Sequence, residues 1–187
     1  MEQTKKGSVL SSLIVGLKLL LICTVIAGVV SFFYALTLDT YEKNLQETRN
    51  RAVGSIYGGD TLTCVTYEAL DGATVYQVLE SDAVIGYCVE VNSPGFGGDV
   101  AVMVGYNADM TVRGVSIISH SETPGLGARV TESGFLSQFE GKGGKVVLGD
   151  DVDAISGATI SSRAVTDGVN LATEILTKVL QTKGGAA

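Results

Sequence analysis

The clearest pattern in the chain is an unbroken apolar run near its N-terminus. Residues Leu19 to Leu38 form a stretch of 20 residues without a charged side chain. A helix of that length spans about 30 Å, the thickness of the hydrocarbon core of a bilayer. Lys18 stands at its N-terminal edge, and the aromatic residues 32–34 near its other end suit a membrane interface. The pattern therefore predicts one transmembrane helix.

A cleaved signal peptide is the competing interpretation of this run. Such a peptide has a shorter apolar core, of about 7–15 residues, followed by a cleavage site of small residues. The run here is longer, and Phe33-Tyr-Ala-Leu-Thr37 is a poor cleavage site. Cys23 lies inside the run, whereas a lipoprotein signal needs a cysteine after it. We therefore expect an uncleaved anchor.

The next segment changes from apolar to polar. Residues 39–56 are rich in helix-forming side chains, and Glu47 and Arg51 stand at helical i,i+4 spacing. We expect a helical stalk that reaches Gly58-Gly59. This gives four parts: a short N-terminal segment (1–18), a membrane helix (19–38), a stalk (39–59) and a folded domain (60–183).

Within the folded domain, short runs rich in Val, Ile and Tyr predict β-strands. Their short connections favour antiparallel pairing. A small helix is expected at 133–139, and a C-terminal helix is predicted by one apolar stripe. The predicted class is α+β, with an antiparallel or mixed sheet. The predicted strands are 73–80, 83–91, 99–106, 111–119 and 146–148, and the stripe consists of Val165, Val169, Ala172, Leu176 and Val179.

The net charge of −7 is distributed unevenly. Residues 1–18 carry one acid and three lysines, whereas the remainder carries 10 basic and 19 acidic side chains. An acidic domain argues against nucleic acid and anionic lipid as partners, and suits solubility or docking to a basic protein. Basic residues flank the apolar run on both sides and do not settle its orientation. The small N-terminal side favours a cytoplasmic N-terminus.

Cysteine and histidine are scarce, with three and one in the chain. Cys64 and Cys88 lie on predicted strands, and we interpret them as buried thiols; a disulfide stays open if the domain faces an oxidising compartment. No metal or iron–sulfur site is expected from this spacing. His120 has no catalytic partner that the sequence can identify, so we expect it to orient its own loop through a hydrogen bond.

The motif with the most chemical content is Asp153-Ala-Ile-Ser-Gly-Ala-Thr159, directly before the C-terminal helix. A helix start offers unpaired N–H groups and a partial positive charge, which favour a phosphate. Thr159 places a hydroxyl there, and Gly157 and Ala158 keep the approach free of bulk. Taken alone, the Ser-Gly-Ala-Thr turn is more simply an N-cap.

Two glycine-dense loops form the second motif. They are Ser93-Pro-Gly-Phe-Gly-Gly-Asp99 and Ser119-His-Ser-Glu-Thr-Pro-Gly-Leu-Gly-Ala128. Glycine and proline at this density predict shaped loops in which the backbone approaches a flat or phosphorylated ligand. Ordinary hairpin turns are the alternative.

Together the two motifs resemble a family of flavoproteins with covalent FMN. The family includes the G subunit of Rnf complexes and the C subunit of the sodium-pumping NADH:quinone reductase. The first motif fits its pattern Asp-x-x-[Ser/Thr]-Gly-Ala-[Thr/Ser], and Glu122-Thr-Pro-Gly-Leu-Gly127 fits its second signature. The similarity covers roughly residues 86–180. It implies that Thr159 carries FMN through a phosphoester and that further residues surround the flavin, namely Ser156, Gly157, Ala158, Glu122, Thr123, Gly125, Leu126 and Phe96.

The resemblance also implies a role. It points to an electron-relay subunit of an Rnf-type complex, which links electron flow between ferredoxin and NAD to sodium or proton translocation. The implied partners are the other subunits, of the A to E types, and a flavin transferase that uses FAD. The flavin domain would then be extracytoplasmic. Because the chain has no nicotinamide fingerprint and no iron–sulfur ligands, we expect no independent catalysis.

Two alternatives remain at this point. A C-type subunit of a sodium-pumping quinone reductase shares the motif, although the length of this chain is closer to that of Rnf G-type subunits. A membrane-anchored flavin-binding sensory or solute-binding module would carry the same fold without electron transfer. At Phe96 the family usually has Tyr or Leu; Phe lacks the tyrosine hydroxyl but keeps a stacking face.

Overall fold

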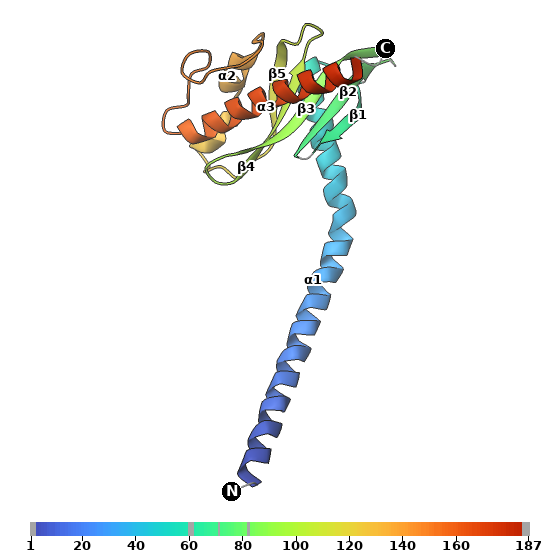
Figure 1. The fold of residues 1–187 in the computed structure, drawn as a ribbon, viewed down its shortest axis with the longest axis vertical. Helices are drawn as coiled ribbons and strands as arrows, with labels where there is room; N and C mark the ends of the chain where they lie inside the picture. Colours follow the sequence, from blue (N-terminus) through green and yellow to red (C-terminus); the bar gives the residue numbers. More distant parts are fainter. Residues whose placement is uncertain (1–2, 60–61, 71, 82, 185–187) are drawn as a thin grey trace. The chain divides into compact units, whose positions relative to one another are not determined.

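The computed structural model describes residues 3–59, 62–70, 72–81 and 83–184. The chain divides into two compact units, residues 1–46 and 47–187. Figure 1 shows the elements in chain order. They are α1 (Gln3–Tyr57), β1 (Thr63–Leu70), β2 (Ala73–Glu80), β3 (Ala83–Pro94), β4 (Asp99–Tyr106), β5 (Val112–Ser119), the 3-10 helix η1 (Gly127–Thr131), α2 (Ser133–Leu136), η2 (Ser137–Phe139) and α3 (Thr159–Gly184).

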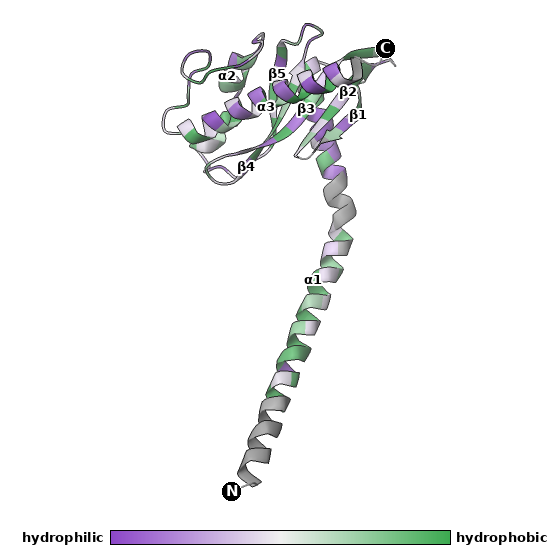
Figure 2. Cartoon of the chain, viewed as in Figure 1, coloured by the Kyte–Doolittle hydropathy of each residue, from purple (hydrophilic) through white to green (hydrophobic). Residues whose placement is uncertain are grey.

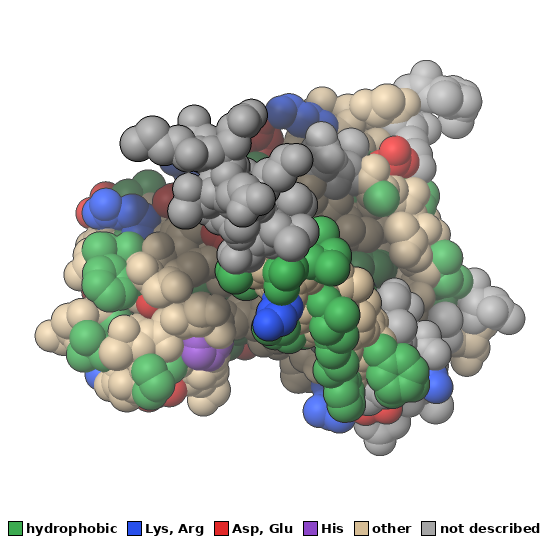
Figure 3. Space-filling model, turned by 90° about the horizontal axis from the view of Figure 1, so that it is seen from below, with side chains coloured by type: hydrophobic (Ala, Val, Ile, Leu, Met, Phe, Trp, Pro, Cys, Tyr) green, Lys and Arg blue, Asp and Glu red, His purple; other side chains and the backbone are tan. Residues whose placement is uncertain are grey.

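The first unit is the N-terminal part of α1. Its stretch Ile14–Tyr34 is long and apolar enough to cross a membrane, by length and composition. The side chains of this stretch are exposed. The hydropathy colouring shows many of its residues in green (Figure 2), and hydrophobic side chains are also green in the space-filling view from below (Figure 3). An exposed apolar surface of this length suits lipid better than water. The stretch begins earlier than the expected Leu19 because Ile14, Val15 and Leu17 extend the apolar pattern past Lys18.

The second unit is built on a five-stranded sheet. Its strand order is β1-β2-β3-β4-β5, and each strand pairs antiparallel with the next. A sheet of this kind needs only short connections, which the turn residues between the strands supply. The predicted α+β class, with an antiparallel sheet and a C-terminal helix, is confirmed.

Helices cover both faces of the sheet. The helix α3 lies across one face (Figure 1), and its apolar stripe packs on valines of β2, β3 and β4. The last turns of α1 pack on the other face, where Val53 and Tyr57 meet Cys88 and Met103. Coverage of both faces explains why β4 is buried along almost its whole length, unlike a strand with one wet face.

Most predicted strand bounds hold within a few residues, but one predicted strand is wrong. Residues 146–148 form only an isolated bridge between Leu148 and Val152. Instead of a neighbouring strand, the side-chain amide of Asn170 in α3 satisfies Val146: it accepts from the Val146 N–H at 2.8 Å and donates to the Val146 carbonyl at 2.9 Å. The apolar run thus marks a loop in which Val146 is buried and Val147 is exposed, not a strand.

The two cysteines of the domain lie on strands that are not neighbours. Cys64 is in β1 and Cys88 in β3, with β2 between them, and both are free thiols. Two interstrand spacings amount to about 9.6 Å, beyond the roughly 7 Å over which a disulfide can form. Burial raises the pKa of both thiols. Cys88 is buried as expected, whereas Cys64 is only partly buried because β1 is the edge strand, and the sheet does not fit a disulfide between them.

Candidate functional site

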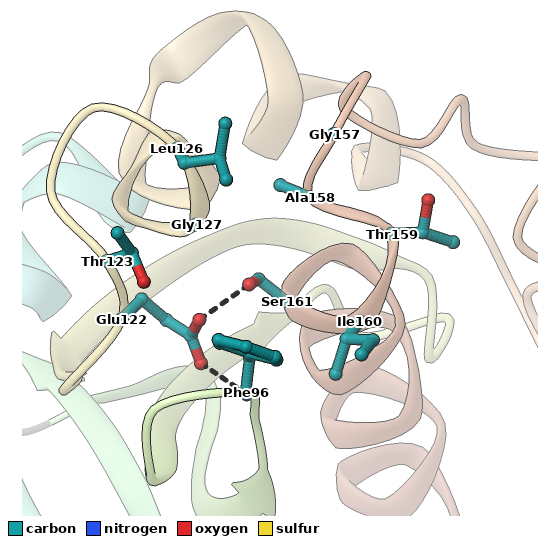
Figure 4. A pocket seen from close by; sticks show the side chains of 10 residues that line it. All are labelled: Phe96, Glu122, Thr123, Leu126, Gly127, Gly157, Ala158, Thr159, Ile160 and Ser161. Carbon is teal, nitrogen blue, oxygen red and sulfur yellow. Dashed lines mark hydrogen bonds between the residues drawn. The ribbon is translucent and has the colours of Figure 1, made fainter.

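A cavity of about 280 Å³ lies beside the first turn of α3. Three segments form its wall: the loop between β3 and β4, the loop that runs from β5 into η1, and residues 157–161 (Figure 4). Seven of the nine predicted site residues line it, and Ser156 and Gly125 do not. The complete lining is Phe96, Glu122, Thr123, Leu126, Gly127, Gly157, Ala158, Thr159, Ile160 and Ser161.

A second, shallower hollow of about 650 Å³ runs along the outer side of α3. It is larger, but its surroundings are mixed charges, with Lys145 and Lys178 near Asp167 and Glu174. None of the predicted site residues lies in it. The smaller cavity, where both sequence motifs meet, is therefore the candidate site.

The start of α3 is shaped by Ser162. Its hydroxyl accepts a hydrogen bond from the Ile155 N–H at 3.0 Å and donates to the Ala158 carbonyl at 3.0 Å. Gly157 takes a φ of +79°, which favours glycine, and lets the chain turn into the helix. The helix then begins at Thr159, whose side chain is exposed.

The hydroxyl of Thr159 is therefore available for chemistry. In Figure 4 it points away from Glu122 and Ser161. The backbone N–H groups of the first helical turn have no carbonyl partner within the helix, and the helix dipole adds partial positive charge there. An oxyanion attached to this hydroxyl would lie against a favourable helix end.

Glu122 is the buried charged residue among those that line the site, with 4% of its surface exposed. Its Oε1 accepts hydrogen bonds from the Phe96 N–H at 2.7 Å and the Gly97 N–H at 3.4 Å. Its Oε2 accepts one from the Ser161 hydroxyl at 2.6 Å. Burial alone would raise the pKa of Glu122, but these hydrogen bonds outweigh it and hold the pKa below its ordinary value. The carboxylate is thus an anion at neutral pH.

The glycines around Glu122 leave room for neighbouring parts of the chain. A Cβ on Gly95 would collide with Glu122 Oε1, and one on Gly127 would lie 2.5 Å from Oε2 and 2.6 Å from Ser161 Oγ. A Cβ on Gly97 would collide with the Ser121 carbonyl. The sequence predicted that these glycines admit a ligand. At these three positions the structure places other parts of the chain in that space.

Three exposed apolar side chains surround the cavity. Phe96 is 68% exposed, Leu126 47% and Ile160 53%. Such side chains in an acidic domain leave a local apolar surface that water solvates poorly. Leu126 also approaches the Gly157 turn, because a Cβ added there would be 3.4 Å from its Cδ1. A flat apolar group could lie between these side chains.

His120 acts as the sequence predicts. Its Nδ1 accepts a hydrogen bond of 3.2 Å from the Glu122 N–H and so helps to set the loop before the cavity.

Sequence reasoning missed Ile160, Ser161 and Gly127 as lining residues. Gly127 ends the Glu-Thr-Pro-Gly-Leu-Gly signature, and Ser161 was assigned to helix capping. Ile160 and Ser161 could have been predicted as lining residues, because they follow Thr159 directly and share its helical turn.

Comparisons with known proteins agree with the motifs. Residues 95–174 match the family described as FMN-binding domain. The chain is 38% identical over 112 residues to the G subunit of the Na(+)-translocating ferredoxin:NAD(+) oxidoreductase complex of Acetobacterium woodii, covering 54% of each chain. It is 29% identical over 189 residues to the G subunit of the ion-translocating oxidoreductase complex of Shewanella piezotolerans, covering 90% of this chain and 89% of the relative.

A solved structure is also similar. The crystal structure of Shewanella oneidensis NqrC aligns with a TM-score of 0.47 and 28% identity, over 58% of this chain and 62% of that chain. The matches to the curated relatives at 38% identity span just over half of their length. The resemblance drawn from the two motifs is confirmed: residues 95–174 match the FMN-binding domain family, and the chain is similar to the G subunits of ion-translocating oxidoreductases.

Proposed function

We propose that this chain is a membrane-anchored electron-transfer subunit of an Rnf-type complex and carries FMN covalently on Thr159. The FMN-binding domain and the similarity to the G subunits of ferredoxin:NAD oxidoreductase complexes support the role. One observation carries the attachment site. An exposed threonine hydroxyl begins α3 at the edge of a cavity that has apolar side chains around it.

The residues of the site fit both the phosphate and the ring system of FMN. The phosphate would lie on Thr159 and the first turn of α3, where N–H groups and the helix dipole favour negative charge. The ring system would lie against Phe96, Leu126 and Ile160, whose exposed apolar surface it would cover. When bound, FMN supplies one- and two-electron transfer, and the protein supplies attachment, position and electrostatics.

Attachment would be a group transfer without oxidation. The Thr159 Oγ would form a bond to the phosphorus of the FMN half of FAD, while the pyrophosphate bond would break and AMP would leave. The hydroxyl proton would pass to solvent or to the transferase. The exposure of Thr159 and its orientation away from Glu122 suit access by a separate flavin transferase. A covalent bond then prevents loss of the cofactor from an exposed site.

The anchor and its orientation complete the proposal. The stretch Ile14–Tyr34 would span the membrane, with residues before it in the cytoplasm and the FMN domain, assigned to residues 60–183, outside. The partners would be the other subunits of the complex, of the A to E types. Electron flow between ferredoxin and NAD would drive sodium or proton translocation in the assembled complex, to which this chain contributes a relay.

Intact-mass analysis of the full chain tests this proposal directly. Purified from its native membrane, the chain should gain the mass of one FMN less one water. Thr159→Ala should lose this mass, and Thr159→Ser should keep it because the hydroxyl is retained. Thr182→Ala, at the exposed far end of α3, serves as the matched control. A wild-type chain without flavin, or covalent flavin on Thr159→Ala, would refute the attachment.

A further inference from the structure

The carboxylate of Glu122 joins three parts of the chain that are distant in sequence. Its two oxygens accept from the β3–β4 loop, at Phe96 and Gly97, and from the first turn of α3, at Ser161. Its own backbone N–H is held by His120. The partners lie 26, 25 and 39 residues away. One side chain therefore fixes the relative positions of all three segments that line the cavity.

These contacts use both carboxylate oxygens. A carboxylate without partners would be costly to bury, whereas hydrogen bonds to an ionised acceptor are short and strong. The bonds to Phe96 and Ser161, at 2.7 and 2.6 Å, are of this kind. Because protein donors already engage both oxygens, the hydrogen bonds of Glu122 in this structure are made within the chain.

The glycines on either side of Glu122 indicate the same role. Gly95 precedes Phe96, and Gly127 follows the Leu126 that faces the turn before α3. At each of them a Cβ would occupy space that the carboxylate oxygens of Glu122 fill. A glycine at both positions lets the two loops close on the carboxylate. The density of glycine here thus reflects contact between protein segments.

We propose that Glu122 is a positioning residue that holds Phe96 and α3 in a fixed relation before any ligand binds. Through it the Phe96 ring is set beside the first turn of α3, where Ile160 and Thr159 lie (Figure 4). The part of this inference that concerns the flavin rests on the function proposed above. The joining of the three segments does not, and it can be measured in protein without flavin.

Hydrogen exchange in the flavin-free full chain, in detergent or nanodiscs, tests the joining of the segments. The Phe96 N–H should exchange slowly in the wild type, because it donates to a buried carboxylate. Glu122→Ala should speed its exchange about ten-fold or more, while Glu122→Gln, which keeps an acceptor oxygen, should restore part of the protection. Ser161→Ala should have an intermediate effect. Glu140→Ala, at an exposed position, is the matched control.

Protection of core amides in β3 shows whether each variant is folded. If Glu122→Ala unfolds, the comparison of Glu122→Gln and Ser161→Ala with the wild type still decides. An unchanged Phe96 exchange rate in folded Glu122→Ala, or in both milder variants, would overturn the proposal.

A second measurement uses chain that carries flavin. Glu122→Gln changes the charge beside the cavity but little of its shape, so the visible spectrum should stay near that of the wild type while the flavin midpoint potential rises. Glu122→Ala should alter the visible circular dichroism of the flavin, because the Phe96 ring is released. Spectra identical to the wild type in Glu122→Ala would overturn the positioning role. If the wild type never acquires flavin, the proposed function fails, and the exchange result for Phe96 stands independently.

Discussion

The hydroxyl of Tyr57, at the end of α1, donates to the carbonyl oxygen of Tyr106 in β4 at 2.9 Å. The carbonyl of Tyr87 in β3 lies at the same distance from that hydroxyl. The ring fits here because residues 86 and 105 are glycines, at which a Cβ would press on Tyr57. The last turn of α1 is thus part of the folded domain, joined to two central strands.

Tyr57→Phe should therefore destabilise the domain. The variant keeps the packed ring but removes the one hydroxyl proton, which lies within hydrogen-bond distance of the Tyr106 and Tyr87 carbonyls, so the buried Tyr106 carbonyl loses this donor. A loss of about 1–3 kcal/mol in the free energy of unfolding is expected. Chemical denaturation followed by tyrosine fluorescence measures it. No change in stability would show that the strand carbonyls are satisfied without Tyr57.

The sequence predicted the strands and the helix whose apolar and polar residues follow a regular spacing. The strands 73–80 and 99–106 have the observed bounds, and the helix that contains Val165 and Leu176 begins at Thr159. The predicted strand 146–148 is wrong because Val146 pairs with the side chain of Asn170 and Val147 with that of Asp151, which no periodicity reveals. The sequence places Cys64 on a strand but does not define the bounds of β1. Its alternation of apolar and polar residues is weak because β1 is an edge strand of the sheet.

The candidate site was predictable in part for a similar reason. Motifs close in sequence identified Thr159, Leu126 and Phe96, which the structure brings to one cavity. The role of Glu122 depends on partners 26 and 39 residues away, so the sequence alone could not assign it. The sequence suggests that the glycines of the two loops let a ligand approach the backbone, whereas in the structure Gly95 and Gly127 leave room for Glu122.

Gly127 and Gly125 should respond differently to alanine. Gly125 has a φ of +73° with open space around it, so Gly125→Ala should cost about 1–2 kcal/mol through backbone strain and leave the cavity intact. Gly127→Ala would place a methyl group against Glu122 and Ser161, which must separate. Its loss of stability should be larger, by overpacking. Only Gly127→Ala should change the flavin spectrum, and equal spectra for the two variants would contradict this assignment.

The buried Glu122 should make the free energy of unfolding depend on pH in the acidic range. Its pKa is lowered in the folded state, so the unfolded chain binds a proton more readily and the contribution of Glu122 is present above its unfolded pKa. This contribution is lost as the pH falls through the lowered folded-state pKa. The gap in unfolding free energy between wild type and Glu122→Gln should therefore shrink as the pH drops below about 4.5.

Urea unfolding at pH 7 and at pH 4 or lower measures that gap. Glu140→Gln, which changes an exposed carboxylate, should show a small gap at both pH values. A gap between wild type and Glu122→Gln that stays constant over this range would mean that Glu122 does not titrate differently in the folded protein.

The proposed orientation predicts a definite protease result. With the N-terminus in the cytoplasm, protease added to protoplasts, or to cells with a permeabilised outer membrane, should digest the chain beyond residue 41. The same domain should be protected in inverted vesicles, and a tag at the N-terminus should show the reverse pattern. Protection in protoplasts together with cleavage in inverted vesicles would place the FMN domain in the cytoplasm and refute the orientation.

The relay role predicts what the isolated chain does not do. The candidate site offers a tethering hydroxyl, apolar walls and one buried carboxylate whose oxygens are already hydrogen-bonded, which is suited to holding a cofactor and not to acid–base turnover of a substrate. Purified alone with its flavin, the chain should be reduced by dithionite and show negligible oxidation of NADH. In the assembled complex, Thr159→Ala should stop electron flow from ferredoxin to NAD, while Thr182→Ala should not.

These outcomes separate the relay from its alternatives. Rapid NADH oxidation by the isolated chain would make it an enzyme in its own right. Full activity of a complex that contains Thr159→Ala would leave the flavin without a part in electron flow, as in a sensory module. Loss of activity with Thr159→Ala and its return with Thr159→Ser would leave the relay as the explanation, because that pair differs in the hydroxyl that carries the cofactor.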